Sequence, residues 1–379
     1  MTSVLRPTRF NPLGLILADM GPLRGLTEIK LTDASGRPTN LYLIMGPNGA
    51  GKTTVLEAIH LAYSLLDGRN CASFGQDDLD RGNGGVQFDA LVALDDGSRS
   101  RLHLLSIVLG DPGLLKRWTP DELALVDAAK QIILHFARAP GIGAIGRTQG
   151  CDSEAIAFAE AILERADDPP RTLFESANGY PTVLYFPSDR GIRRPPEVDR
   201  SITRPKGLGY RAAHRFDIDG TSWESSLDNL FVWFAWLADG REDLCRELVN
   251  QLVFRNGKTL GAIDRQRLLV PVEVNGAAHR LDQLSSGERQ FVQFVVRVAS
   301  HMTGSTLVLI DETEQHLHVV MRRRLINLIR QWAKDYEGVS FVMTSHQTES
   351  MRLLAPKIEE PGLVKGGCLV KPRFAAPHV

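Results

Sequence analysis

A glycine-rich segment, Gly46–Thr54, places the strongest constraint on what this chain can fold into. It reads GPNGAGKTT, fits the pattern GxxxxGK[ST], and connects the apolar run LYLIM to the helix-like run KTTVLEAIHLAYSLL. Between a buried strand and a helix N-terminus, such a loop lets backbone N–H groups and the helix dipole surround a phosphate. A chance glycine-rich turn is the alternative, and the flanking strand and helix argue against it.

The residues of this phosphate loop are expected to take different roles. Lys52 should reach the β- and γ-phosphates of a nucleotide, and the Thr53 hydroxyl should be a ligand of Mg²⁺. The whole loop is expected to bind the nucleotide: Gly46, Pro47, Asn48, Gly49, Ala50, Gly51, Lys52, Thr53 and Thr54.

A second motif is the run Thr306–Glu312, TLVLIDE, which ends in two adjacent carboxylates. It reads as a buried parallel strand that delivers acids to the carboxyl edge of a sheet, where ligands bind in open α/β folds. We expect Asp311 to hold the magnesium and Glu312 to act as the general base for the attacking water. The alternative is that the two acids are simply solvated at a strand end. The phosphate loop upstream argues against this alternative.

A third motif, Leu284–Gln290, reads LSSGERQ and stands ahead of the amphipathic run FVQFVVRVASHM. Hydroxyl and N–H groups at a helix N-terminus make a second phosphate site. The alternative is an ordinary capping box between Ser285 and Glu288. The expected nucleotide contacts here are Ser285, Ser286, Gly287 and Glu288.

The run VSFVMTSH ends in His346. A histidine at a strand end is more often structural than functional. The order of the four motifs along the chain favours a functional role here.

That order, phosphate loop, LSSGE, LVLIDE and TSH, resembles that of the ABC-type ATPases. Residues 311–318, DETEQHLH, further resemble the DExExHLHP segment of prokaryotic AAA-type cassette proteins without a transporter, the OLD group and its stand-alone relatives. Thr313 and Val319 stand where that pattern has prolines. YFPSDR, residues 185–190, is also similar to this group, which includes ATPase subunits of anti-phage systems and is related to RecF and SMC proteins.

The resemblance implies a mechanism and a fold. Two copies would close head to tail around two ATP molecules, with the LSSGE segment of one capping the γ-phosphate bound by the other, and His346 would contact that phosphate. The expected fold is α/β, a P-loop NTPase of ABC type with a mixed or parallel sheet core, an antiparallel β hairpin and a helical insertion. The family's magnesium-sensing glutamine stays open among Gln76, Gln87 and Gln149.

We expect three segments: residues 1–66 and 271–379 forming the ATPase core, and 67–270 forming an inserted lobe. Within the lobe, residues 87–109 predict a hairpin. Thr119 and Pro120 predict the start of a helix that continues through the apolar residues to 137. Residues 153–166 predict another helix, 183–187 a strand, and 222–254 an aromatic-rich helical region interrupted at Gly240.

Composition narrows the function classes. Lys and Arg number 44 against 45 Asp and Glu, so no global field recruits nucleic acid or membrane. Scattered cysteines, no signal-peptide pattern and no long apolar run predict a cytoplasmic protein without membrane contact. About 230 residues without heptads separate the loop from LSSGE, which excludes long SMC-type arms. About 30 residues follow His346, so we expect no Toprim nuclease.

Two functions follow as hypotheses. The first is an ATPase that acts as the sensor or regulatory scaffold of a prokaryotic anti-phage defence system, gating a separate effector protein. The second is a RecF-like DNA-binding ATPase in DNA repair, with the arginine-rich residues 190–211 as its nucleic-acid contact. A solvated loop is the alternative for those arginines, because Asp189, Glu197 and Asp199 interrupt their charge.

Overall fold

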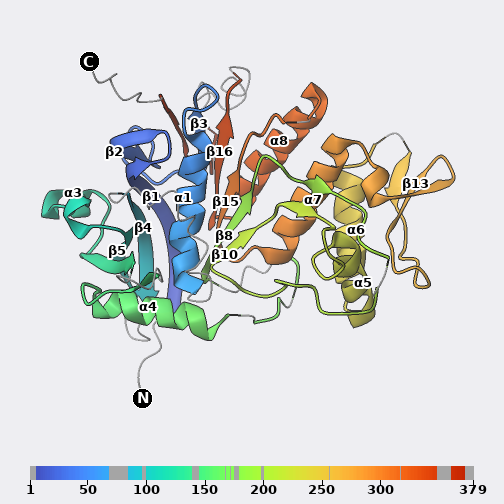
Figure 1. Ribbon diagram of the computed structural model, residues 1–379, viewed down its shortest axis with the longest axis horizontal. Helices are drawn as coiled ribbons and strands as arrows, with labels where there is room; N and C mark the ends of the chain where they lie inside the picture. Colours follow the sequence, from blue (N-terminus) through green and yellow to red (C-terminus); the bar gives the residue numbers. More distant parts are fainter. Residues whose placement is uncertain are drawn as a thin grey trace.

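The computed structural model describes residues 6–67, 84–95, 100–138, 145–166, 168–170, 172–174, 179–197, 200–255, 257–315, 317–347 and 360–371. Two six-stranded sheets form the body of the molecule, with helix α1 (Lys52–Ser64) between them (Figure 1). Helices α5 to α8 cover the far side of the second sheet, on the right in this view.

The first sheet has the order β2-β1-β4-β5-β6-β7. Its strands are β1 (Arg6–Met20), β2 (Leu23–Lys30), β4 (Gly85–Asp95), β5 (Ser100–Leu109), β6 (Gln131–Arg138) and β7 (Ile145–Arg147). The predicted hairpin is confirmed as β4 and β5, which pair antiparallel from Val86 opposite Leu109 to Asp95 opposite Ser100. Helix α4 (Ser153–Glu164), also predicted, packs its buried face against this sheet.

The helix predicted from Thr119 to residue 137 is wrong beyond its first turn. The capping box between Thr119 and Glu122 forms, but α3 covers only Pro120–Leu125. Asp127 then adopts a left-handed backbone conformation, and the run QIILHFAR becomes strand β6, parallel to β5. Its branched and aromatic residues are buried in the sheet, and this tertiary pairing overrides the helical reading of the apolar pattern.

The second sheet has the order β10-β8-β15-β16-β3-β17, and all of its strand pairs are parallel. Its strands are β3 (Leu41–Met45), β8 (Pro181–Phe186), β10 (Ala213–Arg215), β15 (Ser305–Ile310), β16 (Val339–Ser345) and β17 (Lys365–Leu369). The four central strands are buried throughout, as expected for a parallel sheet covered on both faces.

Alternate residues of these strands enter two separate cores. Ile44, Tyr185 and Leu309 face α1 and the first sheet. Leu43, Phe186 and Ile310 face the helices α5 (Leu227–Leu237), α6 (Arg241–Leu252), α7 (Ser286–His301) and α8 (Val319–Asp335). The two-residue period of a strand therefore builds both layers from one sheet.

The remaining elements are short. Strands β12 (Lys258–Leu260), β13 (Pro271–Val274) and β14 (Ala277–Arg280) make a small antiparallel sheet, and β9 (Gly191–Ile192) pairs with β11 (Ile218–Asp219). The break predicted at Gly240 is confirmed, because this residue adopts φ 89° between α5 and α6. The described helices include none with both the length and the apolar character needed to cross a membrane.

The segment boundaries expected at 66 and 270 do not coincide with the two sheets. Strands β8 and β10, from the expected insertion, belong to the second sheet next to β15. Strands β1 and β2, from the expected N-terminal core, belong to the first sheet with β4. Sheet membership depends on pairing between distant segments, which local sequence patterns do not reveal.

The end of α7 generates a prediction about pH. His301 is buried against His214, with ring centroids 4.8 Å apart, and burial together with the charge of Arg297 lowers the pKa of His301 to about 3. An unfolded histidine titrates near pH 6.5, so between these values the unfolded chain binds the extra proton and stability falls as pH falls. Below about pH 6, the free energy of unfolding of the wild type should decrease faster than that of His301→Asn, by about 1.4 kcal/mol per pH unit.

Urea unfolding between about pH 7 and pH 5 measures this difference. His279→Asn, at an exposed position of β14, is the matched control and should keep the wild-type dependence. Equal slopes for the wild type and His301→Asn would contradict the prediction.

Candidate functional site

The phosphate loop leaves the end of β3 and enters α1 at Lys52. Its glycines are required by geometry. Gly51 adopts φ 96°, and a Cβ there would lie 2.9 Å from the Leu23 side chain. A Cβ at Gly46 would lie 2.5 Å from the Val370 carbonyl oxygen. Only glycine therefore lets this loop pack so closely against its neighbours.

Lys52 is buried, and its ammonium donates hydrogen bonds to the carbonyl oxygens of Gly46 and Pro47, both at 3.0 Å. The positive charge of Lys52 is thus held against the backbone of the phosphate loop. Phosphate oxygens at this position would present stronger acceptors than the two carbonyls.

Thr53 and Asp311, the two expected metal ligands, are in direct contact. The Thr53 hydroxyl donates to Asp311 Oδ2 at 2.8 Å, and Thr344 donates to Asp311 Oδ1 at 2.6 Å. Asp311 is completely buried at the end of β15. A hydroxyl and a carboxylate oxygen are the ligands that Mg²⁺ takes, so this pair fits a magnesium ion shared with nucleotide phosphates.

Glu312 adopts a left-handed backbone conformation, φ 46°, which is unusual for a residue with a side chain. Its N–H donates to the Thr344 hydroxyl at 2.8 Å, and the Arg190 guanidinium donates to its carbonyl oxygen at 3.4 Å. Among the described residues its carboxylate accepts no hydrogen bond. The backbone of Glu312 is thus fixed at both of its peptide groups, while its carboxylate is left without a hydrogen-bond partner among the described residues.

Arg190 lies at the candidate site, whereas the sequence suggested for it either a nucleic-acid contact or a place in a solvated loop. It is buried, and it also donates to the carbonyl oxygens of Pro187 at 2.8 Å and Asp311 at 2.7 Å. Burial lowers the pKa of Arg190 to about 10, so the group is charged at neutral pH. Its position in YFPSDR, directly after a buried strand, was the only signal in the sequence.

Glu314 is a second residue whose role the sequence left unassigned. This buried carboxylate accepts hydrogen bonds through Oε1 from the Ser345 hydroxyl and the His346 N–H, both at 2.9 Å. His346 Nδ1 lies 3.0 Å from the same oxygen, and its side chain is partly exposed. Glu314 thereby fixes the orientation of His346 beside the carboxylate turn.

The LSSGE segment forms the capping box that was the alternative interpretation. Ser285 accepts from the Glu288 N–H at 3.3 Å, and Glu288 accepts from the Ser285 N–H at 3.1 Å and from Lys258 at 2.8 Å. Ser285 and Ser286 are exposed, and Gly287 is buried. Within the described residues of one chain, no hydrogen bond or ion pair links this segment to the phosphate loop.

Other predicted residues lie elsewhere or are engaged within the chain. Gln87 is buried in β4 and donates to Asp89, Gln149 lies in an exposed turn ahead of α4, and Gln76 lies outside the described residues. Arg200 donates to three carbonyl oxygens and Arg204 to one. Much of the basic charge of residues 190–211 is therefore bound to the chain's own backbone.

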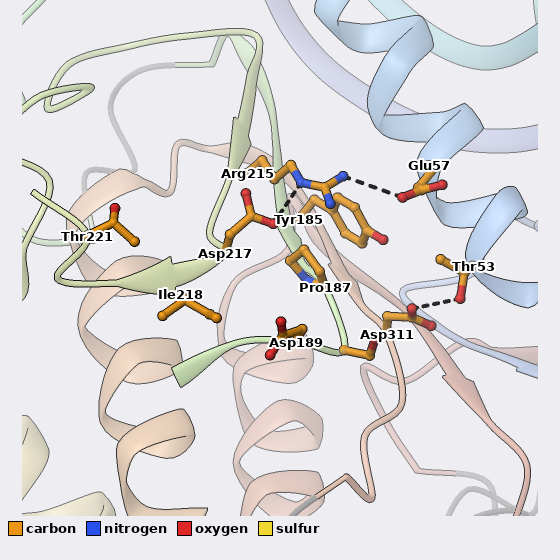
Figure 2. Close-up of a pocket in the computed structure, with 11 residues that line it drawn as sticks. Thr53, Glu57, Tyr185, Pro187, Asp189, Arg215, Asp217, Ile218, Thr221 and Asp311 are labelled. Atoms are coloured by element: carbon orange, nitrogen blue, oxygen red, sulfur yellow. Dashed lines mark hydrogen bonds and ion pairs between the residues drawn. The ribbon is translucent and has the colours of Figure 1, made fainter. Parts of the chain in front are cut away.

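A cavity of about 450 Å³ opens beside Thr53 and Asp311 (Figure 2). The end of β8 and the segment after β10 form its opposite side, with Tyr185, Arg215 and Asp217 among the lining residues. Arg215 reaches across the cavity mouth toward Glu57 of α1, 3.5 Å away, and bonds Asp217 at 2.9 Å. The site thus extends beyond the phosphate loop toward β8.

The Arg190 contacts generate a prediction. Arg190→Met would leave three carbonyl oxygens without their donor, so the free energy of unfolding should fall by about 2–4 kcal/mol in urea titrations. Arg194→Met is the control, because Arg194 is exposed and pairs with Glu197 on the surface; its effect should stay within about 0.5 kcal/mol. Equal stability of the two variants would show that the buried guanidinium does not support the turn.

Comparison with known proteins gives two family matches. A family described as "AAA domain, putative AbiEii toxin, Type IV TA system" matches residues 268–352, and one described as "AAA domain" matches residues 15–85. No curated protein sequence matches the chain.

Several solved structures are similar in fold. The SMC head domain from Thermotoga maritima has 11% identity and a TM-score of 0.36, covering 90% of this chain and 92% of that one. An Smc head domain with an extended coiled coil, bound to the C-terminal domain of ScpA and derived from Pyrococcus furiosus, has 11% identity and a TM-score of 0.41, covering 91% and 92%. An ATP-binding cassette bound to ADP and phosphate has 11% identity and a TM-score of 0.32, covering 91% and 90%.

The two family matches contain the motifs whose geometry is described above. Residues 15–85 include the phosphate loop, and residues 268–352 include LSSGE, the carboxylate strand and His346. These two segments are similar to AAA-domain families, and the parallel sheet that carries the phosphate loop and the carboxylate strand is the α/β arrangement expected of a P-loop NTPase.

Proposed function

We propose that this chain binds ATP with Mg²⁺ and hydrolyses it, as one subunit of a homodimer that closes head to tail around two nucleotides. The contact between Thr53 and Asp311 is the observation that supports this most directly. It joins the phosphate loop to the carboxylate strand, with Glu312 and His346 at the same edge of the sheet. A nucleotide on the loop would therefore present its γ-phosphate to all four groups.

Each residue then has a role consistent with its contacts. Lys52 would exchange its two carbonyl acceptors for phosphate oxygens. Thr53 and Asp311 would hold a magnesium ion, which would supply positive charge beside the phosphates. The free carboxylate of Glu312 orients the attacking water and accepts its proton. His346, held by Glu314 through Nδ1, would donate to the γ-phosphate through its other ring nitrogen, Nε2.

The dimer follows from the position of the LSSGE segment. Ser285 and Ser286 are exposed at the N-terminus of the sixteen-residue helix α7, where N–H groups and the helix dipole favour an anion. Because no hydrogen bond or ion pair among the described residues links this segment to the phosphate loop of its own chain, we propose that it caps the nucleotide of a partner copy. ATP would drive closure, and hydrolysis would reopen the dimer.

The biological role we propose is that of a sensor or regulatory scaffold in a prokaryotic anti-phage defence system, gating a separate effector protein. The description of the family matching residues 268–352 names an AAA domain, a putative toxin and a type IV TA system. The DETEQHLH segment supports the same group by resemblance. We take this as the first of the two functions.

The second proposed function, a RecF-like DNA-binding ATPase, fits the same fold. Its expected contact, residues 190–211, has Arg190 buried and Arg200 and Arg204 bonded to carbonyl oxygens. ATP-dependent duplex binding with a steep salt dependence would favour this second function over the first.

Nucleotide binding tests the phosphate-loop assignment. Lys52→Ala should lose ATP affinity by tenfold or more, on the order of a lost charge-assisted contact, whereas Glu312→Gln should bind ATP like the wild type and hydrolyse it at least about a hundredfold more slowly. Fluorescent-nucleotide titration and phosphate release measure the two effects. Equal affinity of the wild type and Lys52→Ala would exclude this loop as the nucleotide site.

Light scattering tests closure. Glu312→Gln should double in mass on addition of Mg·ATP, and adding Ser285→Arg in the same background should abolish the doubling by placing a bulky side chain at the shared site. Ser285→Asn keeps a capping residue and should allow it. A mass that does not respond to ATP in Glu312→Gln would contradict the closure mechanism.

A further inference from the structure

Tyr185 of β8 has a hydroxyl group that the fold leaves unused. The residue is fully buried, yet its hydroxyl oxygen finds no hydrogen-bond partner among the described residues. It lines the cavity beside the phosphate loop, and Figure 2 shows the hydroxyl pointing toward the side where Thr53, Glu57 and Asp311 lie. A buried hydroxyl without a partner is unfavourable, and such groups in native proteins usually meet a water or a ligand.

The surroundings of this hydroxyl determine what it can bind. Burial raises the pKa of Tyr185, and the nearby charges of Asp311 and Glu57 raise it further, so the group stays protonated and can donate a hydrogen bond. The Arg215 guanidinium lies over the ring, 5.1 Å from its centroid, and holds the ring in place. The hydroxyl oxygen of Tyr185 can also accept a hydrogen bond, so the ligand must offer either an acceptor or a polar hydrogen.

The charges that line the cavity favour a hydrated cation as its ligand. Four carboxylates line it, Glu57, Asp189, Asp217 and Asp311, against the single guanidinium of Arg215. Arg215 is already paired with Asp217 and Glu57, so a free anion would meet mainly negative charge. Water on a divalent cation satisfies both conditions, because its oxygen faces the metal and its hydrogens point outward, where they can donate to the Tyr185 oxygen and to carboxylates.

We propose that Tyr185 is an outer-sphere ligand of the magnesium ion, its phenolic oxygen accepting a hydrogen bond from a water molecule bound to the metal. Glu57 stands one helical turn beyond Thr53 on α1 and accepts a hydrogen bond from the same hydration shell. The inference rests on the proposed ATPase function for the position of the metal at Thr53 and Asp311. It adds a contact from β8, which lines the cavity together with Thr53 and Asp311.

The geometry suits magnesium in particular. Mg²⁺ demands octahedral coordination and gives up its waters reluctantly, so it keeps several of them when bound to a protein and a nucleotide. Groups that hold such waters fix the orientation of the ion and contribute to its affinity. Tyr185 is a positioning residue in this sense, since it acts on the metal through water.

The experiment uses Mn²⁺ as a paramagnetic substitute, with the full chain and ATP. Tyr185→Phe removes only the hydroxyl oxygen. The affinity for Mn²⁺ in the presence of ATP, measured by electron paramagnetic resonance of the free ion, should fall about tenfold. ATP affinity without metal should stay unchanged. Without metal and nucleotide, the melting temperature should stay equal or rise, because an unsatisfied buried oxygen has been removed.

Tyr63 provides a matched control within the same chain. It is also fully buried with an unpartnered hydroxyl among the described residues, but it packs on Phe10 and Phe88 and does not line the cavity. Tyr63→Phe should leave Mn²⁺ affinity at the wild-type value. Glu57→Gln should weaken Mn²⁺ binding, which extends the test to the second contact.

The outcomes separate the two levels of the proposal. If the wild type binds Mn·ATP, Thr53→Ala loses it, and Tyr185→Phe matches Tyr63→Phe in Mn²⁺ affinity, the role of Tyr185 is overturned while the ATPase proposal stands. If the wild type binds neither ATP nor Mn·ATP, the proposed function itself fails, and the inference fails with it. A loss of Mn²⁺ affinity in Tyr185→Phe but not in Tyr63→Phe supports both the role of Tyr185 and the ATPase proposal.

Discussion

The hydrogen bond between Thr53 and Asp311 joins residues 258 positions apart in the chain, and the site depends on it. It forms because β3 and β15 both pair in parallel with β16, so that their carboxyl ends reach the same edge of one sheet. Burial of that sheet on both faces, by α1 and the first sheet on one side and α5 to α8 on the other, fixes the register. Without this arrangement the phosphate loop and the carboxylates would be unrelated sequence motifs.

Around this contact, the turn after β15 stores backbone strain that its neighbours maintain. A left-handed conformation at Glu312 is unfavourable by about 1–2 kcal/mol and persists only where the surrounding structure determines it. Thr344 supplies the acceptor for the Glu312 N–H, and Arg190 supplies donors to the carbonyl groups of the turn. Such strain is common at functional sites. Here the left-handed conformation gives the Glu312 side chain a direction that differs from the one it would have in a continuing strand.

The same network reaches the helix that follows LSSGE. Gln290 of α7 donates to the Arg190 carbonyl oxygen at 3.1 Å, and Arg289 donates to the Ile192 carbonyl oxygen at 2.9 Å. The segment between β8 and β9 is therefore bonded to α7 on one side and to the carboxylate turn on the other. This gives a continuous set of hydrogen bonds between the two parts of the chain that are proposed to contact different nucleotides.

Local patterns in the sequence determined the elements and residues that depend on near neighbours. The glycine-rich loop Gly46–Thr54, the apolar run before Asp311 and the capping box at Thr119 all involve residues a few positions apart, and each forms between the elements predicted for it. The capping box at Ser285, which was the alternative to a phosphate site there, forms as well. The capping box shows the limit of such patterns. At Ser285 it begins a helix of 16 residues, and at Thr119 one of 6.

Only the tertiary structure decided the features that depend on distant partners. Pairing with β5 made residues 131–138 a strand, and pairing with β15 brought β8 into the core sheet. Burial turned Arg190 from a candidate surface charge into the donor that holds the carboxylate turn, and it left the Tyr185 hydroxyl facing the cavity. Composition and spacing describe what a side chain can do, but its environment, set by chain segments far away in sequence, decides which of those capacities is used.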